Sequence, residues 1–258
     1  MKINRANFLT WYNSTSYEQL PIYADSCTYG IVGWAIGENM TFIINTAIGI
    51  PLSGNWVTSL CDLNKNVISS LGNLTTFAGE TSVGGYGYGS FNCPSVPEGL
   101  YILKSVGGST TIYSSPIYVL GTETKTKTAR FKFRHKFSKN GVEYTHSTLG
   151  SFYQKFRLFC NFNSLEFQSQ KDIFQDSDSV LPREYNHKVD YLYKINLLNL
   201  SLDEHQAAHD MATCSELYIN DLPMQVSGSY SAERIRKNGT SNGSFSVSDY
   251  NLRYNKRV

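Results

Sequence analysis

The sequence lacks the cysteine pattern of a disulfide-stapled or zinc-binding protein. Its five cysteines are odd in number and widely spaced, and no Cys-x-x-Cys pair occurs. This spacing argues against a disulfide framework and against a zinc ribbon. The first residues contain no apolar core of signal-peptide length, and no run approaches the ~20 apolar residues that a membrane span needs. We therefore expect free thiols, synthesis in a reducing cytoplasm and no membrane span.

Sequence motifs for catalysis are also missing. The chain contains no nucleophile elbow, no phosphate-binding loop and no kinase motif set. The glycine-rich segment 84–89 has the wrong spacing for a dinucleotide fingerprint. We interpret it as a flexible surface loop that touches a neighbour, with small-ligand binding as the alternative. Asp172, Asp176 and Asp178 lack the EF-hand pattern, which favours a solvated acidic loop. We predict no catalytic residue, no cofactor and no metal, and therefore no enzymatic activity.

Two histidine pairs could in principle hold a metal ion. His205 and His209 are four residues apart on a predicted helix, but Gln206 stands where a zinc protease needs glutamate. We interpret this pair as part of a solvated helix face. His135 and His146 would face each other in the hairpin described below, without an evident third ligand. We interpret them as structural packing.

The residue types that are abundant favour strands. Aromatic residues make up 14% of the 258 residues, with 18 Tyr and 14 Phe, and the apolar content of 41% allows a sizeable core. Residues 1–120 carry 4 Lys/Arg and 6 Asp/Glu, a net charge of −2. Residues 121–258 carry 19 Lys/Arg and 15 Asp/Glu, a net charge of +4. This shift predicts a domain boundary near Gly121.

The spacing of apolar runs and turn residues predicts an all-β protein with an Ig-like β-sandwich followed by a second β-rich domain. Ser201 and Glu204 form a capping-box pattern that starts the one convincing helix, over residues 202–213. A polar loop is expected over 168–184. The predicted organisation is an extended N-terminal arm on the surface at 1–24, the sandwich at 25–120 and the second domain at 121–258.

Residues 130–148 read as a long β-hairpin. Asn140 and Gly141 are the preferred pair for a tight type I′ turn, and this turn would place Phe137 opposite Tyr144. Strict alternation before the turn places phenylalanines on one face and cations on the other. The cations are Arg130, Lys132, Arg134 and Lys136.

The basic face of this hairpin has two interpretations besides a docking role. It could follow a nucleic-acid backbone, with aromatic residues for stacking. The alternative is a solvated strand face, in which lysines also block edge-to-edge aggregation. The total charge of +2 and the lack of a second basic cluster favour the solvated face over nucleic-acid contact.

Three features together resemble structural proteins of tailed bacteriophages, crAss-like phages in particular. They are an aromatic arm ending in Leu-Pro-Ile-Tyr-Ala-Asp at 20–25, a sandwich closing in Tyr-Ser-Ser-Pro-Ile-Tyr-Val at 113–119, and a strand, capped helix and strand at 185–219. The resemblance implies a subunit of a neck or tail ring, or an adaptor, made in the host cytoplasm and located in the virion. Its partners would be copies of itself, in a ring, and neighbouring virion proteins.

We therefore expect a protein that assembles through an interface. The expected interface residues are Arg130, Lys132, Arg134, Lys136, Phe137, Asn140, Gly141, Tyr144, Tyr86 and Tyr88. One alternative is a carbohydrate-binding or receptor-binding tail module, with Trp34, Trp56, Tyr86 and Tyr88 stacking on sugars. Another is a glycan hydrolase, whose two carboxylates need not be close in sequence.

Overall fold

A computed structural model of the chain describes residues 8–13, 32–46, 54–78, 85–137, 144, 149, 151–174, 183–234, 240–249 and 254–256. In these residues the protein is mostly β, with one large, mainly antiparallel sheet and two short helices. None of the helices described is long and apolar enough to cross a membrane. This structure does not show the first strands as a separate Ig-like sandwich, because they are part of the same sheet as the later strands.

Sixteen strands and two helices are described along the chain. The first strands are β1 (Trp11–Asn13), β2 (Val32–Ala35), β3 (Asn39–Thr46), β4 (Trp56–Cys61), β5 (Val67–Ala78), β6 (Gly85–Asn92), β7 (Gly99–Gly107), β8 (Thr110–Ser114) and β9 (Ile117–Leu120). The later elements are α2 (Thr122–Lys125), β10 (Thr128–Arg134), β11 (Gln154–Phe174), β12 (Arg183–Leu200), α3 (Leu202–Ala212), β13 (Glu216–Ile219), β14 (Leu222–Ala232), β15 (Ser241–Asp249) and β16 (Tyr254–Lys256).

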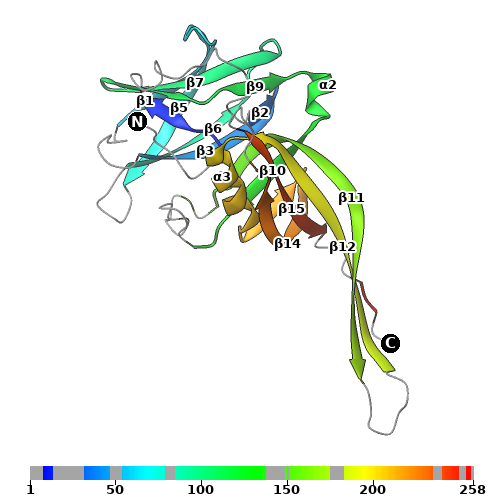
Figure 1. Cartoon of the computed structure of the whole chain (residues 1–258). Helices are drawn as coiled ribbons and strands as arrows, with labels where there is room; N and C mark the ends of the chain where they lie inside the picture. Colours follow the sequence, from blue (N-terminus) through cyan, green and yellow to red (C-terminus); the bar gives the residue numbers. More distant parts are fainter. Residues whose placement is uncertain are drawn as a thin grey trace.

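The long strand β11 connects the two halves of the sheet (Figure 1). On one side it pairs with β10, and the pairings continue through β13, β14 and β15 to β12, which pairs with β11 again. These six strands therefore form a closed ring. On its other side β11 pairs with β2 and, at one position, with β3. The predicted boundary near Gly121 coincides with the short helix α2, and the division into two domains stays a prediction.

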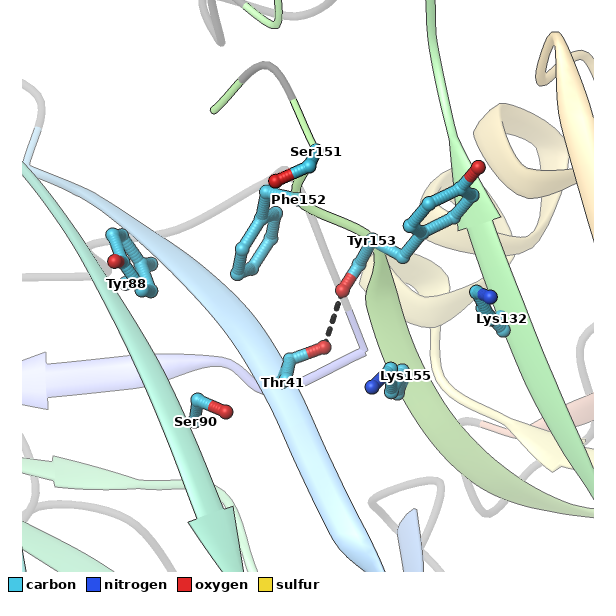
Figure 2. A pocket seen from close by; sticks show the side chains of 8 residues that line it. All are labelled: Thr41, Tyr88, Ser90, Lys132, Ser151, Phe152, Tyr153 and Lys155. Atoms are coloured by element: carbon cyan, nitrogen blue, oxygen red, sulfur yellow. Dashed lines mark hydrogen bonds between the residues drawn. The ribbon is translucent and has the colours of Figure 1, made fainter. Parts of the chain in front are cut away.

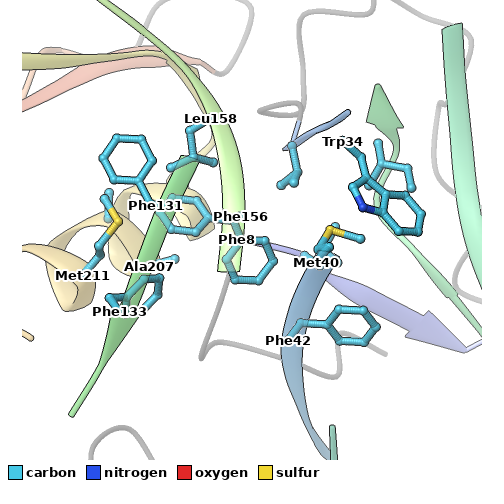
Figure 3. Close-up of a cluster of buried hydrophobic side chains, with 14 of the residues drawn as sticks. Phe8, Trp34, Met40, Phe42, Phe131, Phe133, Phe156, Leu158, Ala207 and Met211 are labelled. Carbon is cyan, nitrogen blue, oxygen red and sulfur yellow. The ribbon is translucent and has the colours of Figure 1, made fainter. Parts of the chain in front are cut away.

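The predicted helix is confirmed as α3. The side chain of Ser201 accepts from the backbone of Glu204, and the Glu204 carboxylate accepts from the backbone of Ser201, so two helix-end amides are satisfied. Ala207 and Met211 face the sheet next to Phe131 and Phe133 of β10 (Figure 3). All four side chains are buried, which fixes the helix against the inner face of β10.

The alternation predicted for 130–134 is confirmed, but the predicted hairpin at 130–148 is wrong. Strand β10 ends at Arg134, and its partner is β11, with Phe131 opposite Phe156 and Phe133 opposite Gln154. The other edge of β10 is taken by β13. A tight turn at 140–141 would require a partner strand that begins at once, yet Tyr144 lies in a turn. Asn140, Gly141 and His146 lie outside the described residues.

Three further expectations are wrong. Residues 168–174 and 183–184 are not part of a loop but belong to β11 and β12. Residues 85–89 belong to strand β6, and a side chain at Gly89 would come within 2.5 Å of the Phe42 ring. Glycine at position 89 therefore permits close packing instead of loop flexibility. In the predicted surface arm, Phe8 and Trp11 are fully buried, so this part of the segment belongs to the core.

A largely buried ion pair ties the β2–β3 turn to β11. The Arg157 guanidinium donates through Nε to Glu38 Oε2 at 2.8 Å and through Nη2 to Glu38 Oε1, and Nη1 donates to the Thr128 hydroxyl at 3.1 Å. Lys125 adds a second cation, 3.2 Å from Glu38. Burial alone would raise the pKa of Glu38, but the hydrogen bonds and charges of Arg157 and Lys125 outweigh it and lower the pKa.

Strands β11 and β12 continue beyond the sheet as a two-stranded ribbon, which we call the arm (residues 165–174 and 183–191). Figure 1 shows the arm leaving the body on the side where β11 and β12 are labelled. In the arm, β11 pairs with β12 alone, and the short strand β16 pairs with β12 at His187–Val189. At about 3.4 Å per residue, the nine steps from 165 to 174 span roughly 30 Å.

The four described cysteines, Cys61, Cys93, Cys160 and Cys214, are unpaired thiols, as their spacing predicts, whereas Cys27 lies outside the described residues. Burial raises the pKa of Cys93, Cys160 and Cys214 to about 12 in each case. The thiolate is the reactive form of cysteine, so these thiols are inert structural groups.

Candidate functional site: a basic aromatic face and the cleft beside it

The cations of β10 share the outer face of the sheet but are engaged by near neighbours. Arg130 forms an ion pair with Asp221, which follows β13. The Lys132 ammonium lies 4.3 Å from the centre of the Tyr153 ring and 4.5 Å from that of Tyr218. Arg134 lies over Tyr153 as well, at 5.4 Å. The stripe predicted from the sequence is therefore an alternating layer of cations and tyrosines.

Tyr153 is the centre of this layer. Its hydroxyl donates to a carboxylate oxygen of Glu216 on β13. Burial, together with the hydrogen bond to the Glu216 carboxylate, raises the pKa of Tyr153 to about 12, so the phenol stays protonated at neutral pH. Tyr153 lies just before β11, and its ring meets Tyr218 edge-to-face at 6.0 Å. Tyr153 thus links the start of β11 to β10 and β13.

The remaining predicted interface residues lie in different environments. Lys136 is exposed, and Phe137 is 75% exposed, which is unusual for a phenylalanine. Tyr144 is buried at 3% exposure, and its hydroxyl accepts a hydrogen bond from the Gln154 side chain at 2.6 Å. His135 packs against the Tyr144 ring, in line with the predicted structural role of this histidine. Only Lys136 and Phe137 of these residues have the exposure that docking needs.

The aromatic residues proposed for sugar stacking separate into two groups. Trp34 and Trp56 are 1% exposed and belong to the core, so they cannot stack on a ligand. Tyr88 on β6 is half-buried, and its ring lies 5.1 Å from that of Phe152. Tyr86 is on the same strand, and its side chain is not among those that the structure describes. Among these four, Tyr88 remains a candidate for ligand contact.

A cleft of about 410 Å³ separates β3 and β6 from β10 and the start of β11 (Figure 2). Its size is typical of sites for small molecules. The Thr41 hydroxyl donates to the Tyr153 carbonyl across its floor, which fixes the two parts relative to each other. The lining residues are Thr41, Tyr88, Ser90, Lys132, Ser151, Phe152, Tyr153 and Lys155. Sequence reasoning missed Lys155, because only the register Lys132–Lys155 brings it next to the β10 stripe.

A second polar cluster that the sequence did not predict surrounds His205. The predicted solvated face is wrong for this residue, which is buried, whereas His209 is exposed. The His205 ring is hydrogen-bonded to the Tyr230 hydroxyl and, through Nε2, to the Ser241 hydroxyl at 2.7 Å. Burial lowers the pKa of His205. Ser241 is fully buried, so the cluster fastens α3 to β14 and β15.

In the described part of the chain, which includes His135, His205 and His209, no group of three metal-ligating side chains occurs. His146 lies outside that part.

Comparison with known proteins gives no relative. No family model, no curated protein and no solved structure matches the chain. Function must therefore be argued from the site and the fold themselves.

Proposed function

We propose that the protein is a structural assembly subunit that docks onto neighbouring subunits through the β11–β12 arm. An isolated two-stranded ribbon is only marginally stable in water, because it lacks a third strand or a packed layer to cover it. Apart from the three-residue strand β16, no described element pairs with the arm. A ribbon of this kind is stabilised when another chain covers it.

The register of the arm supports this role. It pairs Leu165 with Tyr193 and Phe167 with Tyr191. Farther out, the pairs are polar or mixed, as in Gln168–Asp190, Ser169–Val189 and Gln170–Lys188. Two apolar pairs on one face at the base of the arm therefore offer a surface that another chain could cover.

The base of the arm supports it as well. Phe162, the last apolar residue of β11 before the arm, is 47% exposed. Beyond Phe159, the edge of β11 that faces away from β12 has no strand partner among the described residues. An unpaired strand edge offers backbone donors and acceptors to a strand of another chain.

The setting that the sequence resemblance implies is a ring in the neck or tail of a tailed bacteriophage. In this proposal, copies of the chain form a ring, contact neighbouring virion proteins and are located in the virion after synthesis in the host cytoplasm. Identical subunits that dock head-to-tail form a ring when the rotation between neighbours closes, and a protruding arm is suited to head-to-tail docking. The Ig-like packing of 25–120 and the division into two domains belong to the same proposal.

Removing the arm tests this function. Residues 168–190 are replaced by Asn-Gly, which joins the paired positions 167 and 191 with a two-residue turn. We expect the full chain to form an oligomer in sedimentation velocity experiments at high concentration. The shortened chain should stay monomeric and still unfold in one cooperative thermal transition, which shows that the body is folded. The matched control is Phe137→Ser, which removes the exposed apolar residue of the predicted hairpin.

The outcomes separate the two surfaces. If Phe137→Ser alone abolishes oligomers, docking occurs through the 135–137 segment and not the arm. A full chain that stays monomeric at every concentration would contradict the assembly role altogether.

A further inference from the structure

The cleft beside β10 carries an excess of positive charge. Lys132 and Lys155 occupy paired positions on neighbouring strands and both line the cleft (Figure 2). Neither lysine forms an ion pair with a described residue, and none of the eight lining residues is Asp or Glu. Two like charges at opposed positions of a sheet destabilise it. An anion between them would relieve this repulsion.

The surroundings of Lys155 point the same way. Burial lowers the pKa of Lys155, and the charges of Lys132 and Arg130 lower it further. The charge of Asp221 opposes this effect, but Asp221 is already bound to Arg130. Burial of the Lys155 ammonium costs desolvation free energy. A bound oxyanion would offset this cost through a charge-assisted hydrogen bond.

The opposite wall of the cleft is aromatic and hydroxylated. The rings of Tyr88 and Phe152 line one side of the cleft and are in contact, with an angle of 57° between their planes. The hydroxyls of Ser90 and Ser151 lie in the same lining, and Ser90 is held by the Asn39 side chain at 3.2 Å. An aromatic surface next to hydroxyl groups suits a ligand with one apolar face and a rim of hydroxyls, and the paired cations require an acidic group on it.

We propose that this cleft binds a small acidic sugar, whose carboxylate accepts hydrogen bonds from Lys155 and Lys132 and whose ring packs against Phe152. This site is independent of the assembly role, because none of its residues belongs to the arm. Hydrolysis is not part of the proposal, since the lining offers no carboxylate pair for glycosidic bond cleavage.

Titration calorimetry with the full chain tests the site. The probes are glucuronate, glucose as its neutral counterpart and inorganic phosphate. The variant is Lys155→Gln, and the control is Lys194→Gln, which removes an exposed lysine of β12. Loss of one charge-assisted hydrogen bond should weaken glucuronate binding about tenfold or more. We expect glucuronate to bind more tightly than glucose, and Lys194→Gln to leave its affinity unchanged.

Several results would overturn the proposal. They are equal binding of glucose and glucuronate, no binding of either, or an affinity for glucuronate that Lys155→Gln leaves unchanged. Binding of phosphate without binding of glucuronate would show a general anion site and refute the sugar assignment. Thermal unfolding of Lys155→Gln serves as the folding control, because removal of one of two opposed cations should not lower the midpoint temperature.

Discussion

The Arg157–Glu38 ion pair should make a large contribution to stability, because it is the buried polar link between the β2–β3 turn and β11. Replacing Arg157 by Met keeps much of the side-chain volume but leaves the Glu38 carboxylate without its bidentate partner. Removing one partner of a buried pair costs roughly 3–5 kcal/mol. Glu38 is 17% exposed and keeps Lys125 as a partner. We therefore expect the free energy of unfolding to fall by about 2–3 kcal/mol, at or below the lower end of that range.

Urea unfolding at pH 7, followed by fluorescence of the buried tryptophans, measures this loss. The variants are Arg157→Met, Glu38→Gln and the double variant, and the two single losses should not add, because the residues share one interaction. The pH dependence gives a second readout. The folded-state pKa of Glu38 is lowered, so its contribution is present above the unfolded-state pKa and is lost as the pH falls through the lowered value.

A loss of less than about 0.5 kcal/mol for Arg157→Met, the size expected of an exposed surface pair, would contradict a stabilising role of this ion pair. Additive single losses would equally show that the two side chains do not act together.

Three further predictions concern separate elements. Ser201→Ala should destabilise the protein by about 1 kcal/mol, because the N-cap of α3 is lost; an unchanged urea midpoint would show that the cap is dispensable. Gly89→Ala should cost about 1–3 kcal/mol by forcing a methyl group against the Phe42 ring, and a neutral effect on the thermal midpoint would mean that the ring moves freely. The neutral form of His205 is favoured by burial, so its contribution should be complete above about pH 6.5 and decline as the pH falls below that value. His205→Gln should flatten this dependence in thermal melts between pH 7 and 5, and an equal slope in both proteins would assign it to other groups.

The sequence predicted best those features that depend on neighbouring residues. The capping box of α3 acts within one helical turn, so Ser201 and Glu204 suffice to place its start. The alternation of Phe131 and Phe133 with cations follows from the pleat of a single strand.

Features that depend on distant partners were predicted less well. The Asn140-Gly141 pair favours a tight turn locally, but β10 is fixed instead by strands on both edges, including β13, more than eighty residues later. The pattern predicts a polar loop at 168–184, although residues 168–174 and 183–184 belong to the arm, because a two-stranded ribbon carries many polar residues. From residue 185 on, the alternation indicates a strand, and this part is confirmed as β12. The sequence pattern predicts a solvated position for His205, because its partners Tyr230 and Ser241 come from later strands.

The candidate site was predicted in part. Arg130, Lys132 and Arg134 do share one face, but the sequence could not show that Tyr153, Tyr218 and Asp221 engage them. Lys155 enters the cleft only through the register of β10 and β11, which no local pattern specifies. The roles of Asn140, Gly141 and Tyr86 in an interface stay predictions.

The most direct test of the assembly role is electron microscopy of the purified full chain at high concentration. We predict closed rings in which the arm of each subunit, residues 165–174 and 183–191, lies against the body of the next. Particles of single subunits, or rings in which every arm projects into solvent, would contradict docking through the arm.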